Sequence, residues 1–262
     1  MARLTMLGVG HSEAMAHWNN NAMITSNGRH LLIDAGYTIK YALNDQGLTL
    51  ADIDAVFITH THADHCFGLE RMAYECRFRY GFKPRLILPP GVYEELWHQT
   101  LRGVMGQVGE GPATLDDFFD VEILRGDRFT FEGVDLRCFQ NRHTPAKPSY
   151  GLFINDHLLF SGDTRAIPDI IGPLNPSVIL HDCTLADWNP VHASLGELET
   201  AYSSDLRRRM YLMSYEDHFE TVRPVVESRF AGFARQGQAF MLRPAASRSA
   251  GGSEAQRHEL VT

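Results

Sequence analysis

A cluster of metal-binding residue types directly follows a short apolar run in the first quarter of the chain. The segment Ala55 to Leu69 reads AVFITHTHADHCFGL, and its first four residues are apolar. His60, His62, Asp64 and His65 then stand within six positions of one another. Neutral imidazoles and carboxylates are the ligands that Zn, Mn and Fe sites use, and close spacing on a turn lets them converge. The segment therefore requires a fold in which a buried strand delivers this turn to a metal site.

Short apolar runs predict a chain of strands with helices between them. Each run is rich in apolar or β-branched residues and stops at Gly, Asn or Asp. The predicted strands cover residues 3–7, 22–26, 31–33, 55–58, 85–88, 119–124, 128–131, 134–140, 150–154, 157–161, 178–180 and 209–213, and the predicted helices cover residues 37–46, 68–80, 92–101, 195–202 and 221–236. The glycine-rich residues 103–112 are predicted to form a mobile loop. This order predicts sheets packed on each other with helices outside.

Length and composition indicate one folded domain with little affinity for long nucleic acid. The chain has 262 residues, of which 44% are hydrophobic, and this suits a single domain. We assign residues 1–242 to that domain and expect the small, polar residues 243–262 to form a disordered tail. The net charge of −8 argues against binding to long nucleic acid, because such binding needs cationic side chains that neutralise phosphates. A small-molecule substrate fits better.

The sequence also predicts a cytoplasmic protein with no membrane association. It has no stretch of about 18 consecutive apolar residues, and its N-terminal segment lacks the regions of a signal peptide. The four cysteines are scattered without a Cys-x-x-Cys pair, which indicates neither a disulfide framework nor a zinc ribbon. We therefore expect them to be reduced.

The His-x-His-x-Asp-His turn resembles that of the metallo-β-lactamase superfamily. An apolar strand that ends in Asp34 precedes it, as in the superfamily. Further on, His143 follows the predicted strand 134–140 and Asp163 stands in the sequence SGDT, which match the third and fourth motifs. The resemblance covers roughly residues 3–240. It implies an α/β fold, the αββα sandwich of two mixed β-sheets flanked by helices, with metals at one edge.

The resemblance further implies one or two Zn²⁺ ions, with Mn²⁺ or Fe as alternatives. The implied ligands are His60, His62 and His143 for the first metal, Asp64 and His65 for the second, and Asp163 as the bridge. Two neighbouring cations lower the pKa of a shared water toward neutrality, so this water is the expected nucleophile. Asp34 is expected to orient a ligand as a hydrogen-bond acceptor rather than to bind metal.

The segment VILHDCTLADWNPVHASLGEL resembles the ribonuclease Z-like, small-phosphodiesterase branch of the superfamily. In that branch a His-acidic-x-Thr turn, here His181, Asp182 and Thr184, is followed by a histidine, here His192, that protonates the leaving alkoxide. An aspartate beside a histidine raises the imidazole pKa and fixes the ring, as a general acid near pH 7 requires. The alternative is that both histidines are ordinary polar residues at a strand end and a helix cap.

Two features depart from that branch. The last ligand of the branch is a histidine in a Leu-x-His-Tyr pattern, whereas this chain has Ser214 in the sequence LMSY. The second metal would then bind weakly, take His218 as a ligand, or be absent. In addition, His143 and Asp163 are only 20 residues apart, which leaves no room for the arm with which ribonuclease Z grips transfer RNA. We therefore expect a compact phosphodiester as the substrate.

Together these features predict a metal-dependent hydrolase, a phosphodiesterase acting on a small phosphodiester or cyclic nucleotide through a metal-bound hydroxide. Its predicted catalytic residues are Asp64, Asp182 and His192. A carbonyl hydrolase of the lactonase, thioesterase or β-lactamase type is the alternative enzyme, and it has less need of the Asp182 and His192 pair. A non-catalytic binding protein with a degenerate second metal site is the other alternative. Relatives in this branch are commonly dimers, so the resemblance implies a homodimer.

Overall fold

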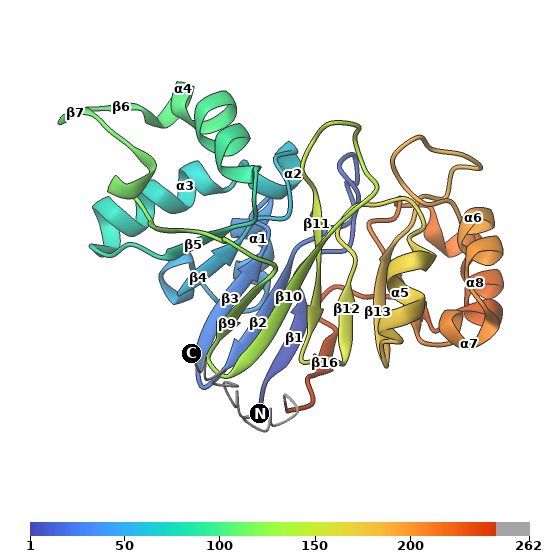
Figure 1. Ribbon diagram of the computed structural model, residues 1–262. Helices are drawn as coiled ribbons and strands as arrows, with labels where there is room; N and C mark the ends of the chain where they lie inside the picture. The colour runs from blue at the N-terminus through green and yellow to red at the C-terminus, as the bar shows by residue number, and fades with distance from the viewer. Residues whose placement is uncertain (245–262) are drawn as a thin grey trace, which may run out of the picture.

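Two seven-stranded mixed sheets face each other in the middle of the molecule (Figure 1). The computed structural model describes residues 1–244. The first sheet contains, in spatial order, β16 (Ala239–Met241), β1 (Arg3–Met6), β2 (Ala22–Ser26), β3 (Arg29–Ile33), β4 (Ala55–Phe57), β5 (Arg85–Leu88) and β8 (Asp120–Ile123). The second contains β15 (Gly232–Phe233), β14 (Met210–Met213), β13 (Val178–Asp182), β12 (Leu158–Phe160), β11 (Tyr150–Ile154), β10 (Val134–Gln140) and β9 (Arg128–Phe131).

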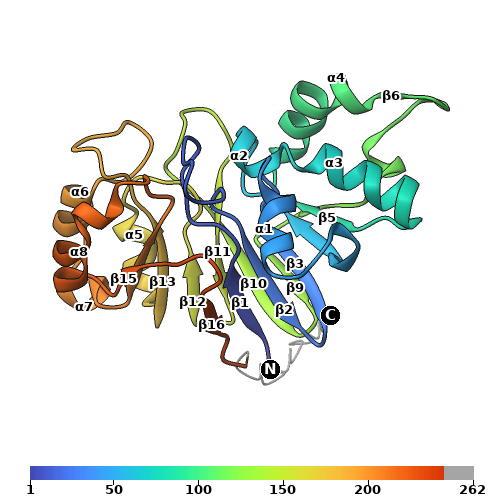
Figure 2. The same cartoon turned by 180° about the vertical axis from the view of Figure 1, so that it is seen from behind.

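Helices lie on the outer sides of the two sheets, which confirms the expected αββα sandwich (Figures 1 and 2). Those beside the first sheet are α1 (Ile39–Asp45), α2 (Ala63–Cys66), α3 (Leu69–Tyr74) with its π-helical continuation η2 (Glu75–Tyr80), the π-helical η3 (Glu94–Leu101) and α4 (Arg102–Met105). Those beside the second are α5 (Pro168–Leu174), α6 (Leu195–Ala201), α7 (Ser204–Arg207) and α8 (Arg223–Arg229). Short 3₁₀ turns are η1 (Leu50–Asp52), η4 (Leu115–Asp117) and η5 (Phe219–Thr221).

Successive side chains of a strand point to opposite faces of its sheet and so pack into two different hydrophobic cores. In β3, Leu31 and Ile33 pack into the core between the sheets, whereas Leu32 packs into the core beneath α1 and α3. This follows from the two-residue period of a strand. The parallel strand β4 is covered on both faces and is apolar throughout, so it holds the turn that follows it on a rigid base.

All twelve predicted strands are confirmed, five of them to the residue and the others with ends displaced by one or two residues. A tight turn joins β11 to β12, and its residues Asn155 and Asp156 both have a left-handed φ, of 51° and 49°. The predicted helix 221–236 is wrong in its second half: α8 ends at Arg229, and the chain enters β15 through Gly232 at φ 127°. A left-handed φ interrupts a helix, and glycine adopts it at little cost.

The predicted loop at residues 103–112 is also wrong. The chain there forms α4 and then a small hairpin of β6 (Gln107–Val108) and β7 (Gly111–Pro112), in which Gly111 adopts φ 125°. The expected tail lies, from residue 245 onward, outside the described residues. Among residues 1–244, no helix has the length and apolar character that crossing a bilayer requires. All four cysteines are free and buried, in agreement with the expected reduced state.

Candidate metal centre

The six predicted ligands gather at one edge of the sandwich, where several strands end side by side. The turn after β4 supplies His60 and His62, and α2 supplies Asp64 and His65. The second sheet supplies the other two from the loops that follow β10 and β12. Figure 1 shows the loop between β10 and β11 rising at the same upper edge as the loop that follows β13. Adjacent strand ends at one sheet edge bring together side chains that are far apart in the sequence.

Three imidazoles converge on a common point. The ligand atoms of His60, His62 and His143 all lie within 4.8 Å of one another. His62 Nδ1 is 3.0 Å from His60 Nε2 and 3.1 Å from His143 Nε2. Nitrogen ligands about 2.05 Å from a tetrahedral Zn²⁺ are about 3.3 Å apart, so the observed spacing suits such an ion closely.

The outer nitrogens of two of these rings are committed to hydrogen bonds. His60 Nδ1 donates to Thr59 Oγ1 at 3.0 Å, because that hydroxyl donates its own proton to Asp34 Oδ2 at 2.7 Å. His143 Nδ1 donates to the carbonyl oxygen of Val191 at 3.1 Å. Each bond fixes the tautomer that leaves the Nε2 lone pair free for a cation. Thr59 and Val191 were not predicted to orient the ligands. The only sequence signal for this role is the position of Thr59 directly before His60.

A second group lies beside the first. His65 Nε2 is 3.2 Å from Asp163 Oδ2 and 3.3 Å from Asp64 Oδ2. The same Asp163 oxygen is 4.0 Å from His60 Nε2, so it stands between the two groups. Asp34 accepts a 2.7 Å hydrogen bond from His65 Nδ1 and is fully buried, in the orienting position expected from the sequence.

Burial and charge set the protonation of these groups. Burial lowers the pKa of His60 well below its ordinary value and that of His143 to about 4, so both rings are neutral and able to bind a cation. Burial alone would also lower the pKa of His65, but the surrounding carboxylates, Asp163 foremost, raise it well above its ordinary value. Asp163 Oδ1 is buried and has no hydrogen-bond partner. A cation between the two groups would satisfy this orphaned oxygen, so the donor set fits the implied metals.

Asp182 and His192 form the pair expected from the sequence. Asp182 Oδ2 accepts a 2.7 Å hydrogen bond from His192 Nδ1, and His192 remains 24% exposed. Burial opposes the charged form of His192, but the Asp182 carboxylate outweighs it and raises the pKa of His192 to about 10. His181 takes no part, since its Nε2 is bonded to the hydroxyl of Tyr202 in the core. The pair lies at the centre, because ligand atoms of His143, Asp163 and His192 lie within 4.8 Å of one another.

Ser214 stands directly after β14 in a left-handed conformation, with φ 62°, and is 3% exposed. The proposed substitute ligand His218 does not join the other ligands: the metal-capable groups among residues 1–244 consist of His60, His62, His65, His143, Asp163 and His192. Asp64, His65 and Asp163 lie together beside the first group, since His65 Nε2 is close to a carboxylate oxygen of each aspartate.

Comparison with known families identifies the chain. A family model described as Anti-Pycsar protein Apyc1 matches residues 2–240. The chain belongs to this family. The Anti-Pycsar protein Apyc1 of Paenibacillus harenae is 38% identical over 219 residues, which are 82% of this chain and 90% of that protein. Those of Paenibacillus sp. (strain J14) and Bacillus phage 010DV004 are 35% and 33% identical, over 92% and 91% of this chain and 99% and 98% of their own lengths.

Solved structures show that the family fold is the metallo-β-lactamase fold. A diphosphatase from the PhnP family superposes with a TM-score of 0.76 at 17% identity, covering 94% of this chain and 99% of its own. The metallo-β-lactamase fold protein YhfI from Bacillus subtilis gives 0.73 at 16% identity, covering 91% and 98%. The short form of human tRNase Z gives 0.64 at 17% identity, covering 92% and 99%. These likenesses confirm the fold expected from the sequence motifs.

Proposed function

We propose that this protein is a metal-dependent phosphodiesterase that hydrolyses a small cyclic nucleotide. The family to which it belongs consists of cyclic nucleotide degraders. The observation that carries the proposal is the meeting of the histidine and aspartate cluster with the Asp182 and His192 pair at one sheet edge. A phosphodiester needs both parts, because charge builds up on phosphorus while an alkoxide departs.

We further propose the ligand roles that the motifs imply. His60, His62 and His143 would hold the first divalent metal, Asp64 and His65 would hold the second, and Asp163 would contribute to both. Zn²⁺ suits this nitrogen-rich donor set. When bound, the ions supply an acidified water as the nucleophile and neutralise charge on the phosphate. We propose that the second ion would bind more weakly than the first, because three residues would hold it and Ser214 stands where the resembling branch has a further histidine.

His192 is the proposed general acid. Its pKa of about 10 keeps the ring protonated near pH 7, and its partial exposure lets Nε2 face a substrate while Nδ1 is held by Asp182. As the water oxygen joins phosphorus, the bond from phosphorus to one sugar oxygen breaks. His192 gives its Nε2 proton to that oxygen, and the product is a linear nucleoside monophosphate.

The proposal also distinguishes this protein from a carbonyl hydrolase. A carbonyl hydrolase can use the same metals, but it has less need of a histidine that a buried aspartate keeps charged, so the Asp182 and His192 pair favours the phosphodiesterase. The test is an assay of metal-loaded protein on cyclic nucleotides, bis-p-nitrophenyl phosphate, a lactone and nitrocefin side by side. Turnover of the lactone or nitrocefin without any phosphodiester turnover would reject the proposal.

Two variants separate the ligand role from the acid role. His62→Ala removes a ligand and is expected to lose both metal content and activity. His192→Ala is expected to keep its metal while its turnover falls by about 100-fold or more. Elemental analysis and steady-state rates measure both quantities on the same samples. A His192→Ala variant as active as the parent would exclude the acid role.

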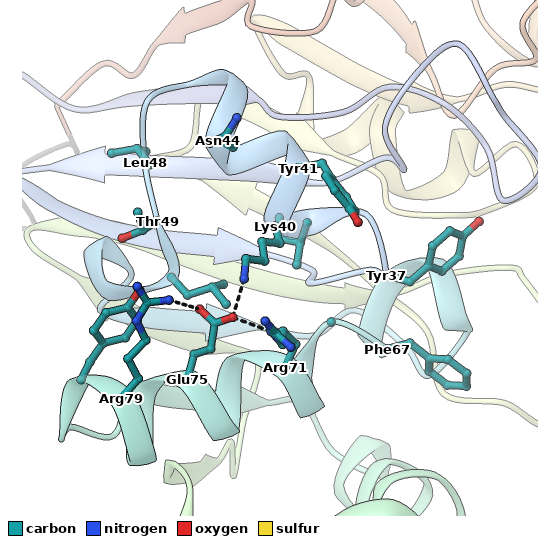
Figure 3. Close-up of a pocket in the computed structure, with 14 residues that line it drawn as sticks. Tyr37, Lys40, Tyr41, Asn44, Leu48, Thr49, Phe67, Arg71, Glu75 and Arg79 are labelled. Carbon is teal, nitrogen blue, oxygen red and sulfur yellow. Dashed lines mark hydrogen bonds and ion pairs between the residues drawn. The ribbon is translucent and has the colours of Figure 1, made fainter.

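The proposed homodimer is supported by one surface beside the metal-binding turn. A cavity of about 680 Å³ lies between α1 and η2, and Figure 3 shows three aromatic side chains, Tyr37, Tyr41 and Phe67, along it. All three are about half exposed, although aromatic rings are typical of protein interfaces. Phe67 directly follows α2, so a partner seated here would also brace the ligands Asp64 and His65. We propose that a second copy of the chain covers this surface.

Two further proposals concern the extent of the domain and the location of the protein in the cell. Residues 1–242 act as one hydrolase domain, because ligands from both sheets are needed to complete one site. The protein acts in the cytoplasm, which the four free, buried cysteines favour.

A further inference from the structure

A partly buried cluster of three side chains adjoins the metal centre and has no place in the chemistry described above. Lys147 Nζ donates to Thr61 Oγ1 at 2.8 Å and to Glu95 Oε2 at 2.7 Å. Thr61 Oγ1 in turn donates to the same Glu95 oxygen at 2.8 Å. Thr61 is 7% exposed, and the side chains of Lys147 and Glu95 are 24% and 18% exposed. We call this closed triangle of hydrogen bonds the Lys147 clamp.

The clamp joins the two segments that carry the first three ligands. Thr61 lies between His60 and His62 in the turn after β4, and Lys147 lies four residues after His143 in the loop between β10 and β11. One ammonium group therefore ties together both sources of the converging imidazoles. Glu95 belongs to η3, so the clamp also anchors both segments to a helix outside the sandwich.

The loop that carries Lys147 needs such an anchor. Its base is closed by a hydrogen bond from Asn141 N to the carbonyl oxygen of Ser149, at 2.8 Å. Between these residues the chain reverses sharply, and Ala146 adopts a left-handed φ of 61° directly before the lysine. A residue other than glycine holds that conformation only where surrounding contacts compensate for its cost.

Charge explains why the lysine is paired. An isolated ammonium beside the ligands would repel a bound cation. Glu95 neutralises that charge while it accepts from both partners. Groups that orient metal ligands through hydrogen bonds commonly contribute 10-fold to 100-fold to metal affinity.

From this geometry we propose that Lys147 is a positioning residue, which together with Glu95 and Thr61 sets the spacing of His60, His62 and His143 and so the affinity and geometry of the first metal. The inference rests on the proposed metal-binding function. It differs from a direct contact with substrate, in which Lys147 would leave metal binding unchanged.

The first experiment measures metal affinity, without turnover, by competition with a chromophoric chelator for Zn²⁺. Lys147→Met is expected to lower the affinity by about 10-fold or more, and Lys147→Arg to restore most of it. The control is Lys83→Met, the same change at an exposed lysine that donates to the carbonyl oxygen of Asp116. It is expected to bind as the parent does. Equal affinities for Lys147→Met and the parent would overturn the inference.

Cobalt substitution supplies a spectroscopic readout. The visible bands of Co²⁺ at the site are expected to shift in Lys147→Met and to return toward the parent spectrum in Lys147→Arg. A parent-like spectrum and affinity combined with a raised KM for a cyclic nucleotide would assign Lys147 to substrate binding and overturn the positioning role. Should Lys147→Met fail to fold by circular dichroism, Glu95→Gln and Thr61→Val carry the same expectation and the same overturning result.

The parent protein keeps the two proposals distinguishable. A parent that takes up no metal in either assay refutes the proposed function itself. A parent that binds metal, beside clamp variants that bind equally well, refutes only the positioning role.

Discussion

At the scale of single residues, the site is built from histidines that each have one nitrogen engaged by the protein. His60 and His65 both depend on Asp34, the first through Thr59 Oγ1 and the second directly. Burial raises the pKa of Asp34, and hydrogen bonds from His65 and Thr59 oppose this rise. One buried carboxylate thus fixes two tautomers, which places their free nitrogens toward the neighbouring ligands.

The Asp182 and His192 pair predicts a specific pH dependence. His192 must be protonated to donate, and the carboxylate of Asp182 raises its pKa to about 10, so the active form persists up to mildly alkaline pH. In Asp182→Asn the charge is lost while burial still disfavours the imidazolium, so the pKa falls to its ordinary value of about 6.5 or below. The alkaline limb of the kcat profile is therefore expected to move from near pH 10 to below about pH 7, with about 30-fold less activity at pH 8.

Asn is nearly the same size as Asp, so metal content serves as the control in this comparison. Both proteins are expected to hold equal metal across the pH range, because Asp182 is not among the proposed ligands. An Asp182→Asn profile whose alkaline limb coincides with that of the parent would mean that another group supplies the proton.

At the scale of elements, α2 is placed by a close approach of backbone. A Cβ built on Gly36 would stand 1.9 Å from the carbonyl oxygen of Asp64, in the first turn of α2. Asn21 links the same segments, since its Oδ1 accepts from Gly36 N at 3.0 Å and its Nδ2 lies 3.4 Å from that carbonyl oxygen. The turn after β3 and the ligand-bearing helix therefore fit each other without space for a methyl group.

Gly36→Ala is expected to displace α2 and with it Asp64 and His65. The variant should lose the more weakly held metal first and unfold at a lower temperature than the parent, as elemental analysis and differential scanning calorimetry would show. Gly103→Ala is the matched control, because nothing lies within 4 Å of its added Cβ and alanine favours the helix α4 by up to about 1 kcal/mol. Parent-like metal content in Gly36→Ala would contradict the expected displacement.

Elements with a strong local pattern were predictable from the sequence, and those defined by distant contacts were not. The strand 134–140 alternates buried and less buried side chains and agrees with β10 to the residue. By contrast, β15 has only two residues, too few for a recognisable pattern, and it is defined by its parallel pairing with β14 across the intervening helix α8. Helix α5 escaped prediction because it contains Pro173 and ends at Asn175 with a left-handed φ of 46°. Proline inside a run argues against a helix, and here tertiary packing outweighs it.

The same contrast holds within the site. The turn from His60 to His65 is recognisable in the sequence because its metal-binding residue types are close together. The Lys147 clamp joins residues 34, 52 and 86 positions apart, and a single lysine, glutamate or threonine is ordinary in any sequence. Such a cluster becomes recognisable only when the fold places the turn after β4, the helix η3 and the loop between β10 and β11 side by side.

At the scale of the whole molecule, the metal centre joins the two halves of the sandwich. The first sheet supplies His60, His62, Asp64 and His65, and the second supplies His143 and Asp163. A cation bound by these residues would bridge the sheets and stabilise the folded state over the unfolded one. The surface lined by Tyr37, Tyr41 and Phe67 adjoins this junction on the side of the first sheet, so the proposed dimer interface and the proposed metal site would share α2 as a neighbour.

The proposed homodimer is testable by a single charge placed on this surface. The ring of Tyr41 is 61% exposed and stacks on Trp18, with ring centroids 5.5 Å apart, so Tyr41→Glu would bury a carboxylate at the interface without disturbing the core. Burying an unpaired charge costs several kcal/mol, more than an interface of modest size can absorb. Light scattering is expected to give twice the mass of one chain for the parent and the mass of a single chain for Tyr41→Glu. The control is Val225→Glu, on α8 beside the other sheet, where the residue is 45% exposed; this variant is expected to stay dimeric. A monomeric parent would exclude this surface as the interface. A dimeric Tyr41→Glu would exclude it too.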